Sequence, residues 1–424
     1  MDKPFLLTLL QVTIKIGASF TPFSYGRLFL ATFLSHRFNK GWFPLTHTRY
    51  KVYALTCITE IVMNIRYELL PESQQKKLPA DQSSLGFGNL RTNHMFVMDY
   101  KNGEWQDQRI IPYAPFTDIT PGSVALHYGQ TIFEGAKAFQ HPNGELYTFR
   151  YDMNIDRLNQ SAEIICMPTV PFDMHMEAAQ RLLDIERAWC PTVPESSIYI
   201  RPFMFATEDT LGVRPGKTFR FCIMLSPSGP YYAGGFNEAV SLLITKKFHR
   251  AVAGGTGEAK CGGNYAAGML ATKAAEDKGC GQVLYLDATN NTIEEAGAMN
   301  HYHVLKDGTF IIPQFTGTIL RSITSRSMLE LAQAGHIVAR QEVIQLHDFI
   351  AGLQNGEIIE AGGFGTAAVI SPVARYVFDD DTSVAVGDGK PGQHSARLYQ
   401  LYSDIQTGKT PAPEGWMQEV PHFS

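Results

Sequence analysis

Hydrophobic positions follow two different periods along the chain from residue 63 onward. Ile155, Leu158, Ala162 and Ile165 recur at the spacing of one helix face, and Asp152 stands where a helix N-cap is expected. These positions predict a helix over 152–165 with a buried apolar stripe.

Runs of aromatic and β-branched residues indicate strands in the same part of the chain. The segments 197–205 (SIYIRPFMF) and 219–225 (FRFCIML) have this composition. A turn-rich stretch, SPSGPYYAGG at 226–235, follows them and is the clearest domain boundary. Helical and strand periods together predict an α+β (mixed α/β) fold. We expect a small α/β domain at 63–228, an interdomain loop at 229–235 and a larger domain at 236–424.

The composition of the 424 residues is that of a folded protein, and its charge favours a small-molecule partner over nucleic acid. Hydrophobic residues make up 44% and charged residues 18% of the chain, which is far from the composition of disordered chains. The net charge of -5 provides no basic surface for nucleic acid. The six cysteines form no CxxC pair, so no metal site or redox dithiol is expected, and a reducing compartment is favoured.

The first 62 residues differ in charge from the rest of the chain. Seven lysines and arginines stand there against Asp2 and Glu60, and they leave no uncharged run long enough for a membrane helix. Two explanations stay open: a basic transit peptide, or sequence upstream of a start at Met63. We expect no membrane partner and a cytoplasmic protein, unless residues 1–62 are a transit peptide.

A lysine among glycines is the first candidate for chemistry, in GGTGEAKCGGNY at 254–265. This stretch is not a phosphate-binding P-loop, because Ala259 precedes Lys260 and Cys261 follows it, whereas that motif requires Gly-Lys-Ser or Gly-Lys-Thr. Taken alone, a loop lysine is usually a solvated charge. Its neighbours in the sequence change that interpretation.

The second candidate is IEEAGAMN at 293–300, where two glutamates precede a turn of small residues. A carboxylate beside a pyridine nitrogen keeps that nitrogen protonated, so the ring can accept electrons. Thr318 and Ile319 are predicted to begin a helix, and the free N–H groups of a helix start bind phosphate. A lysine amine, a carboxylate, a phosphate cradle and the arginine at position 157 together indicate a pyridoxal phosphate site.

These segments resemble the branched-chain aminotransferases, which are fold-type IV pyridoxal phosphate enzymes of the class IV aminotransferase family. The resemblance extends from about residue 80 to the C-terminus and rests on motifs in the same order. It implies a smaller N-terminal α/β domain, a larger domain with a pseudo-barrel, and the cofactor between them. The motifs are GFG at 86–88 with TNHM at 92–95, HYGQTIFEG at 127–135, FR to DRL at 149–158, YIRP at 199–202, GPY at 229–231, KCGGNY at 260–265, EAGAMN at 295–300, GTI at 317–319 and GTAA at 365–368.

The resemblance implies roles for the cofactor-binding residues. Lys260 resembles the lysine that binds the cofactor covalently, Tyr265 the tyrosine that donates to its phenolic oxygen, and Glu295 the partner of its ring nitrogen. Glu295 is preferred to Glu294, because in the family an asparagine follows this glutamate by five positions, as Asn300 does here. Glu294 is then expected to be an exposed charge. The phosphate cradle is implied at Arg157, the backbone of Thr318 and Ile319, and the Thr366 hydroxyl.

The resemblance also implies a substrate site with an aromatic wall for aliphatic side chains. In this family Phe87 and Tyr128 belong to the domain that reaches the neighbouring subunit's site, so a homodimer is implied. Arg201 resembles the group linked to the second carboxylate of glutamate. The backbone N–H groups of Ala367 and Ala368 resemble the site of the substrate α-carboxylate. The aromatic wall is implied at Phe87, Tyr128, Phe133, Tyr199 and Tyr231.

The sequence departs from the pattern of some relatives in two respects, at three positions. Ala298 stands where some of them have a hydroxyl group, and Ala368 and Ser371 stand where mammalian relatives have a redox CxxC pair. Thiol regulation of that kind is therefore not expected here.

The resemblance implies an enzyme that transfers the amino group of leucine, isoleucine or valine to 2-oxoglutarate by a ping-pong reaction with pyridoxal 5'-phosphate. The partners are then small amino acids and 2-oxo acids. Two alternatives stay open within the fold, a D-amino acid aminotransferase and an aminodeoxychorismate lyase, although Tyr199, Arg201, Tyr128 and Phe133 argue against both. A catalytically silent binding homologue is a third alternative.

Overall fold

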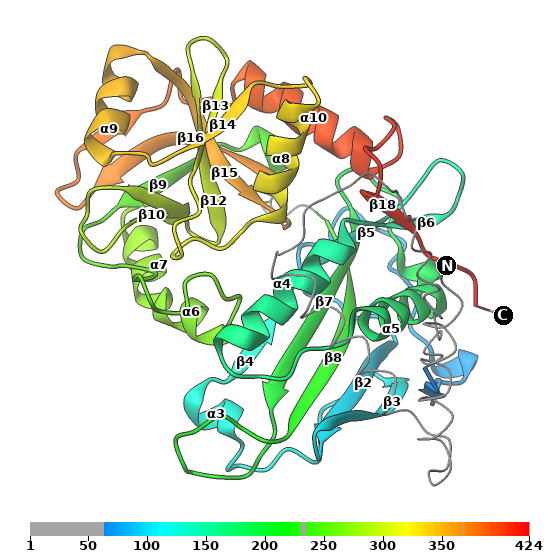
Figure 1. Ribbon diagram of the computed structural model, residues 1–424. Coiled ribbons are helices and arrows are strands. Elements are labelled where there is room, and N and C mark those ends of the chain that lie inside the picture. Colours follow the sequence, from blue (N-terminus) through cyan, green and yellow to red (C-terminus); the bar gives the residue numbers. More distant parts are fainter. Residues whose placement is uncertain (1–62, 230–234, 368, 424) are drawn as a thin grey trace, which may run out of the picture. The chain divides into compact units, whose positions relative to one another are not determined.

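The structure, a computed structural model, describes residues 63–229, 235–367 and 369–423 (Figure 1). These residues form two β-sheets with helices packed against them, so the predicted mixture of α and β structure is confirmed. Among them, no helix is long and apolar enough to cross a lipid bilayer. The domain boundary expected at 226–235 stays a prediction.

The first sheet combines strands from the N-terminal part with one strand from near the C-terminus. Its order is β1-β3-β2-β8-β7-β5-β6-β18, with β4 paired to β7. Its pairs are antiparallel apart from β1 with β3. Because β18 pairs with β6, this sheet includes residues beyond 63–228. The strands are β1 (Arg66–Tyr67), β2 (His94–Lys101), β3 (Glu104–Pro112), β4 (Thr131–Phe133), β5 (Ala136–Gln140), β6 (Leu146–Phe149), β7 (Ser197–Ala206), β8 (Phe219–Ser228) and β18 (Met417–Glu419).

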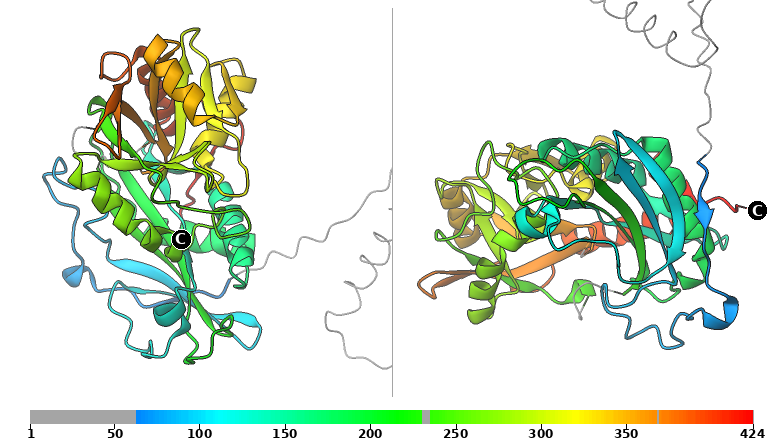
Figure 2. Two further views of the ribbon diagram at one scale, coloured as in Figure 1. Left: turned by 90° about the vertical axis from the view of Figure 1, so that its left-hand side faces the viewer. Right: turned by 90° about the horizontal axis from the view of Figure 1, so that it is seen from below.

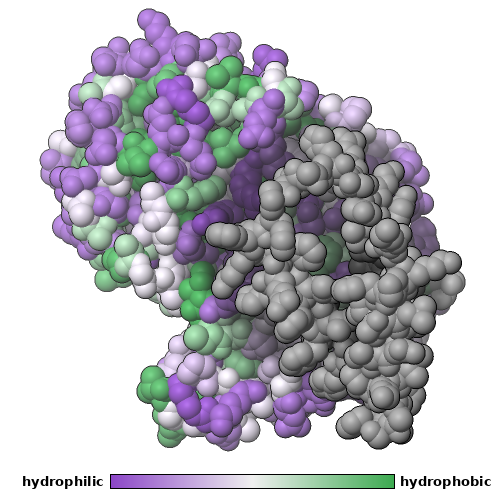
Figure 3. Space-filling model, viewed as in Figure 1, coloured by the Kyte–Doolittle hydropathy of each residue, from purple (hydrophilic) through white to green (hydrophobic). Residues whose placement is uncertain are grey.

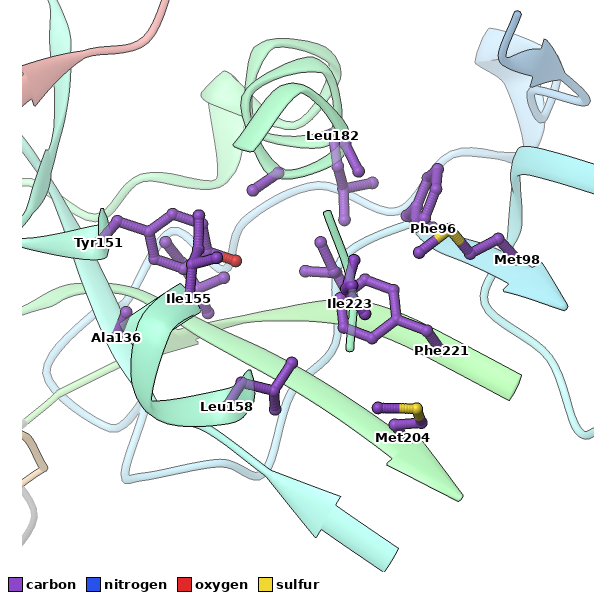
Figure 4. Close-up of a cluster of buried hydrophobic side chains, with 14 of the residues drawn as sticks. Phe96, Met98, Ala136, Tyr151, Ile155, Leu158, Leu182, Met204, Phe221 and Ile223 are labelled. Atoms are coloured by element: carbon purple, nitrogen blue, oxygen red, sulfur yellow. The ribbon is translucent and has the colours of Figure 1, made fainter. Parts of the chain in front are cut away.

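Two helices, α4 (Tyr151–Ile164) and α5 (Phe172–Ile185), pack against this sheet (Figures 1 and 2). Ile155, Leu158 and Ala162 are fully buried, as the helical spacing predicted, and they belong to one hydrophobic cluster. Figure 4 labels Ile155 and Leu158 within it. Burial of the Ile155 and Leu158 side chains contributes about 1.5–3 kcal/mol each. The remaining short helices of this region are η1 (Glu72–Gln74), α3 (Val124–Tyr128) and η2 (Arg187–Trp189).

The predicted N-cap of α4 is wrong by two positions. The helix begins at Tyr151, and Arg150 is the N-cap residue, with a φ of 48°. Its backbone N–H donates to Trp416 O at 2.7 Å, and its guanidinium donates to Glu330 at 2.7 Å. Contacts with distant segments therefore hold this helix start, and Asp152 lies within the first turn.

The second sheet closes on itself. Its order is β11-β10-β9-β16-β15-β12-β13-β14, and β11 also pairs with β12, so the six strands from β11 to β12 form a closed barrel. Strand β17 pairs with β16. The strands are β9 (Val240–Ile244), β10 (Gln282–Leu286), β11 (Ile293–Ala296), β12 (Met299–Leu305), β13 (Phe310–Pro313), β14 (Ala339–Glu342), β15 (Ile358–Gly365), β16 (Val369–Phe378) and β17 (Ser383–Ala385). The helices are η3 (Gly235–Asn237), α6 (Gly262–Ala267), α7 (Met269–Asp277), α8 (Ile323–Gln333), α9 (Leu346–Asn355) and α10 (Gln393–Gln406).

The helix predicted to begin at Thr318 and Ile319 begins later, at Ile323. Ser322 is the N-cap residue, and its Oγ accepts a hydrogen bond from Ser325 N at 3.2 Å. The preceding residues are held outside a helix because Leu320 N donates to Glu295 at 2.8 Å. A carboxylate distant in the chain therefore delays the helix by about one turn.

One group of hydrogen bonds between elements of the two sheets surrounds Arg157 and Lys260. Arg157 on α4 donates to Arg321 O at 3.0 Å, just before α8, and Lys260 N donates to Ser161 Oγ on α4 at 2.9 Å. Phe133 N on β4 donates to Lys260 O at 3.0 Å. Residues that the sequence analysis singled out therefore lie where the two sheets meet.

Candidate active site

A cavity of about 620 Å³, here called the main cavity, lies at this junction. Both sheets contribute to its lining. Ten of the predicted site residues line it, and they lie far apart in the sequence. They are Phe87, Phe133, Arg157, Tyr199, Arg201, Lys260, Tyr265, Glu295, Thr366 and Ala367.

Lys260 precedes α6 and is fixed through its backbone, while its amine faces the main cavity. The backbone bonds to Ser161 and Phe133 hold its position from the first sheet. Its Nζ lies 2.6 Å from Tyr265 Oη, and 4.8 Å from the ring centre of Phe133. Tyr265 reaches it because α6 begins at Gly262, which turns the tyrosine back toward the lysine. The amine is therefore oriented by a hydroxyl group and two aromatic rings.

Glu295 is buried in β11 and presents its carboxylate to the main cavity. Its Oε1 accepts hydrogen bonds from Leu320 N at 2.8 Å and from Asn300 Nδ2 at 3.1 Å, and Arg250 Nε lies 3.0 Å from its Oε2. Asn300 is the residue opposite Glu295 in the β11–β12 pair. Because a tight hairpin joins β11 to β12, two residues five positions apart face each other across the strand pair.

Burial raises the pKa of Glu295, and the Arg250 charge opposes this shift. Arg250 lines the main cavity as well. It is a site residue that the sequence analysis missed, because a single arginine ten positions before the lysine carries no signal of its own.

Glu294 is buried as well, so the expectation that it is an exposed charge is wrong. Successive side chains of a strand point to opposite faces, and Glu294 does not line the main cavity. Its Oε1 accepts a hydrogen bond from the Thr318 hydroxyl, and burial raises its pKa. Only one of the adjacent glutamates can therefore act in the cavity.

Arg157 is held by a second buried carboxylate that the sequence analysis did not assign. Glu134, fully buried in the FEG motif, accepts from Arg157 Nε at 2.7 Å and from Arg157 Nη2 at 2.9 Å. Burial would raise the pKa of Glu134, but the Arg157 charge and hydrogen bonds outweigh burial and lower it. This bidentate pair orients the guanidinium toward the cavity.

The glycine of the same motif makes room for a cavity residue. A Cβ atom on Gly135 would lie 1.9 Å from Tyr199 Oη. That hydroxyl also accepts a hydrogen bond from Arg201 Nη2 at 3.1 Å, and both residues face the cavity from β7, two positions apart. The ring of Phe87 packs edge-on against Tyr199 at 4.8 Å. One wall of the cavity is therefore aromatic, with a single guanidinium.

The remaining predicted residues fall outside the main cavity or outside the described part of the chain. Thr318 and Ile319 are buried but do not line the cavity. Tyr128 lies on α3 with 42% of its surface exposed and donates to Leu211 O. Tyr231 and Ala368 lie outside the described residues.

The start of α8 replaces the predicted helix start near the cavity. Its N-cap residue Ser322 lines the main cavity, and so does Leu320. The first N–H groups of the helix belong to Ile323 and Thr324, and such groups have no partner within a helix. Together with Arg157 they provide donors for an anion. Sequence periodicity could not place this start, because a tertiary hydrogen bond to Glu295 sets it.

Comparisons with known proteins agree with this geometry. The amino-transferase class IV family matches residues 131–376, and the chain belongs to that family. The chain is 43% identical to branched-chain-amino-acid transaminase 1 of Bacillus subtilis over 342 residues, which covers 80% of this chain and 95% of that protein. It is 39% identical to a branched-chain-amino-acid aminotransferase of Mycobacterium tuberculosis, covering 79% and 92% of the two chains.

Solved structures of branched-chain amino acid aminotransferases share the fold. One crystal structure of the branched-chain amino acid aminotransferase of Escherichia coli matches with a TM-score of 0.65 and 28% identity, covering 78% of this chain and 99% of that one. A second structure of the Escherichia coli enzyme matches with a TM-score of 0.61 and 26% identity, covering 77% and 99%. The fold type and family predicted from the sequence are confirmed.

Proposed function

We propose that the protein binds pyridoxal 5'-phosphate and transfers amino groups between branched-chain L-amino acids and 2-oxoglutarate. One observation carries this proposal. The Lys260 amine, 2.6 Å from the Tyr265 hydroxyl, shares one cavity with the buried Glu295 carboxylate and with Arg157. The relatives named above are transaminases of branched-chain amino acids, which supports the substrate class.

The donor set suits a phosphorylated pyridine ring. Lys260 would hold it covalently, Tyr265 would donate to its phenolic oxygen, and Glu295 would accept from its ring nitrogen. The phosphate would bind Arg157 and the N–H groups of Ile323 and Thr324 at the start of α8, with Thr366 adding a hydroxyl. Bound pyridoxal phosphate would supply an aldehyde for the substrate amine and a ring that can hold the electrons freed when the Cα proton leaves.

Residues of the chain would then move the proton. The Lys260 amine, once free, would remove the proton from the substrate Cα and would then deliver it to the carbon of the cofactor that had been bonded to this amine. The hydrogen bond with the Tyr265 hydroxyl would keep this amine close to the pyridine ring. Arg250 favours the ionised form of Glu295 against the effect of burial, which keeps the carboxylate able to hold a proton on the ring nitrogen.

The cavity wall fits an aliphatic substrate. Phe87, Phe133 and Tyr199 exclude water from the side chain, and transfer of a leucine side chain into such a site is worth about 1.5–3 kcal/mol. Arg201 would bind the second carboxylate when glutamate occupies the same place. The turn at Thr366 and Ala367, with Ala368 of the same motif, would bind the α-carboxylate through backbone N–H groups.

The test combines labelling with a substrate panel. Purified protein should absorb visible light, and borohydride reduction followed by peptide mapping should place the pyridoxyl group on Lys260. Leucine, isoleucine and valine should react with 2-oxoglutarate, whereas D-alanine should not. Lys260→Ala should lower turnover by several orders of magnitude, while Lys247→Ala, which removes an exposed lysine paired with Asp379, should not. A label on another lysine, or a preference for D-alanine, would refute the proposal.

The surface near α3 supports a homodimer. Leu126, Leu211 and Val213 are 67%, 70% and 84% exposed, and Tyr128 joins them through its bond to Leu211 O. Figure 3 shows hydrophobic residues on the surface where Figure 1 places α3. Exposed apolar clusters of this kind mark interaction surfaces, and a second copy of the chain is the partner we propose.

Light scattering coupled to gel filtration tests the homodimer. The wild-type protein should elute at twice the chain mass, and Leu211→Asp with Val213→Asp should shift it toward the monomer. Val338→Asp provides a control at another exposed apolar residue, 65% exposed, and should leave the mass unchanged. A wild-type monomer, or equal dissociation by the control, would exclude this surface as the interface.

A further inference from the structure

Lys137 is a buried lysine that the proposed chemistry does not use. It lies on β5 of the first sheet, and only 6% of its surface is exposed. Its Nζ donates to Ala367 O at 3.1 Å, across 230 positions of sequence. The contact therefore connects the first sheet to the β15–β16 turn, which lines the main cavity at Thr366 and Ala367.

The turn that accepts this hydrogen bond is conformationally strained. Gly365 pairs with Val369 at its base, and Val369 has a φ of 61°. A β-branched residue rarely adopts the left-handed region, because its Cβ crowds the neighbouring carbonyl oxygen there. Such a conformation persists only where surrounding contacts enforce it, and the lysine contact is placed to do so.

A second cavity lies behind the turn, and Lys137 stands between this cavity and the turn. The second cavity has a volume of about 490 Å³, and Ala367 lines both this cavity and the main cavity. Burial lowers the pKa of Lys137 to about 8, with Glu195 opposing the shift. The side chain therefore carries a positive charge at neutral pH, and this charge polarises the peptide group that begins at the Ala367 carbonyl.

We propose that Lys137 is a positioning residue for the substrate carboxylate. It holds the Thr366–Ala367 turn in the conformation that presents its backbone N–H groups to the main cavity, and it adds a positive charge behind that turn. This inference rests on the proposed function, because it assigns the turn to the α-carboxylate. Lys137 itself is not a catalytic residue.

The experiment compares ligands with and without a carboxylate, on the holoenzyme. Lys137→Met should raise the KM for leucine and the Kd for 4-methylvalerate, measured by calorimetry, by about tenfold or more, as expected for loss of a charged hydrogen bond. The single-turnover reaction of 3-methylbutylamine, which is leucine without its carboxylate, should stay within about twofold. Lys137→Gln, which keeps a neutral donor, should give an intermediate Kd.

Lys409→Met is the matched control, because Lys409 lines the second cavity and is exposed. It should leave the KM and the Kd unchanged. The inference is overturned if Lys137→Met changes carboxylate binding no more than this control, or if the amine reaction falls as far as the leucine reaction. A wild-type enzyme that does not turn over leucine would instead refute the proposed function. If Lys137→Met does not fold, an unchanged Kd in Lys137→Gln overturns the inference.

Discussion

At the residue scale, neighbouring side chains of identical type have different environments. Glu295 faces the main cavity with Leu320 N, Asn300 and Arg250 around it, whereas Glu294 bonds to the Thr318 hydroxyl on the other side of β11. Strand alternation alone separates them. A difference of one position along β11 therefore decides which carboxylate faces the main cavity and can accept a hydrogen bond from a pyridine nitrogen.

Glutamine substitutions distinguish the two glutamates. Glu295→Gln should slow Cα deprotonation strongly while the cofactor stays bound, because an unprotonated pyridine is a poorer acceptor of electrons. Glu294→Gln should change the rate little, since the amide oxygen can still accept from Thr318. Single-turnover kinetics with leucine measure both, and the reverse ranking would contradict the assignment of Glu295.

At the element scale, a glycine between β4 and β5 lets the neighbouring strand β7 place Tyr199 close to the chain. The end of β4 and the start of β5 are linked by Glu134 and Gly135, and β7 lies beside them. Because Tyr199 Oη occupies the space of a Cβ at Gly135, the motif glycine determines where the aromatic wall stands.

Replacing Gly135 with alanine should displace the aromatic wall of the main cavity. Gly135→Ala should destabilise the protein by about 1–3 kcal/mol through overpacking and raise the KM for leucine. Adding Tyr199→Phe removes the hydroxyl and should recover part of the stability. Thermal melts compare these variants with Gly281→Ala, where the nearest atom would lie at 3.6 Å, an ordinary contact. Equal effects of the two alanines would show that the close approach does not matter.

At the scale of the whole molecule, three buried histidines couple stability to pH. Burial lowers the pKa values of His175 and His303 to about 3, and that of His301 well below its ordinary value. Both ring nitrogens of His301 have no hydrogen-bond partner among the described residues. All three are neutral in the folded protein at pH 5, whereas an unfolded chain protonates them below about pH 6.5.

The contribution of these histidines to the free energy of unfolding should therefore be complete above pH 6.5 and should decrease as the pH falls toward 3. Each histidine contributes up to about 1.4 kcal/mol per pH unit in this window, because the unfolded chain binds the additional proton. Denaturant unfolding at pH 7.5 and pH 5 measures the slope. His301→Leu should reduce it, whereas His347→Asn, at an exposed histidine, should not. An unchanged slope in His301→Leu would contradict the prediction.

The sequence by itself determined the features that depend on local spacing. Lys260 and Tyr265 stand five positions apart, and one turn of α6 brings them together. Glu295 and Asn300 face each other because a short hairpin connects them. The apolar stripe of α4 followed from helical period. These relations need only the geometry of one element, so motif and periodicity suffice, and with the family resemblance they predicted the fold type and the class of enzyme.

Only the tertiary structure decided the features that depend on contacts between distant segments. The start of α8 moved to Ile323 because Glu295, on another strand, binds Leu320 N. Three further contacts join residues that are far apart in the chain. They are Glu134 with Arg157, Arg250 with Glu295, and Lys137 with the Ala367 carbonyl. Local sequence carries no signal for such pairs, since burying a charge or a donor costs free energy that is offset only by a partner which the folded chain brings close.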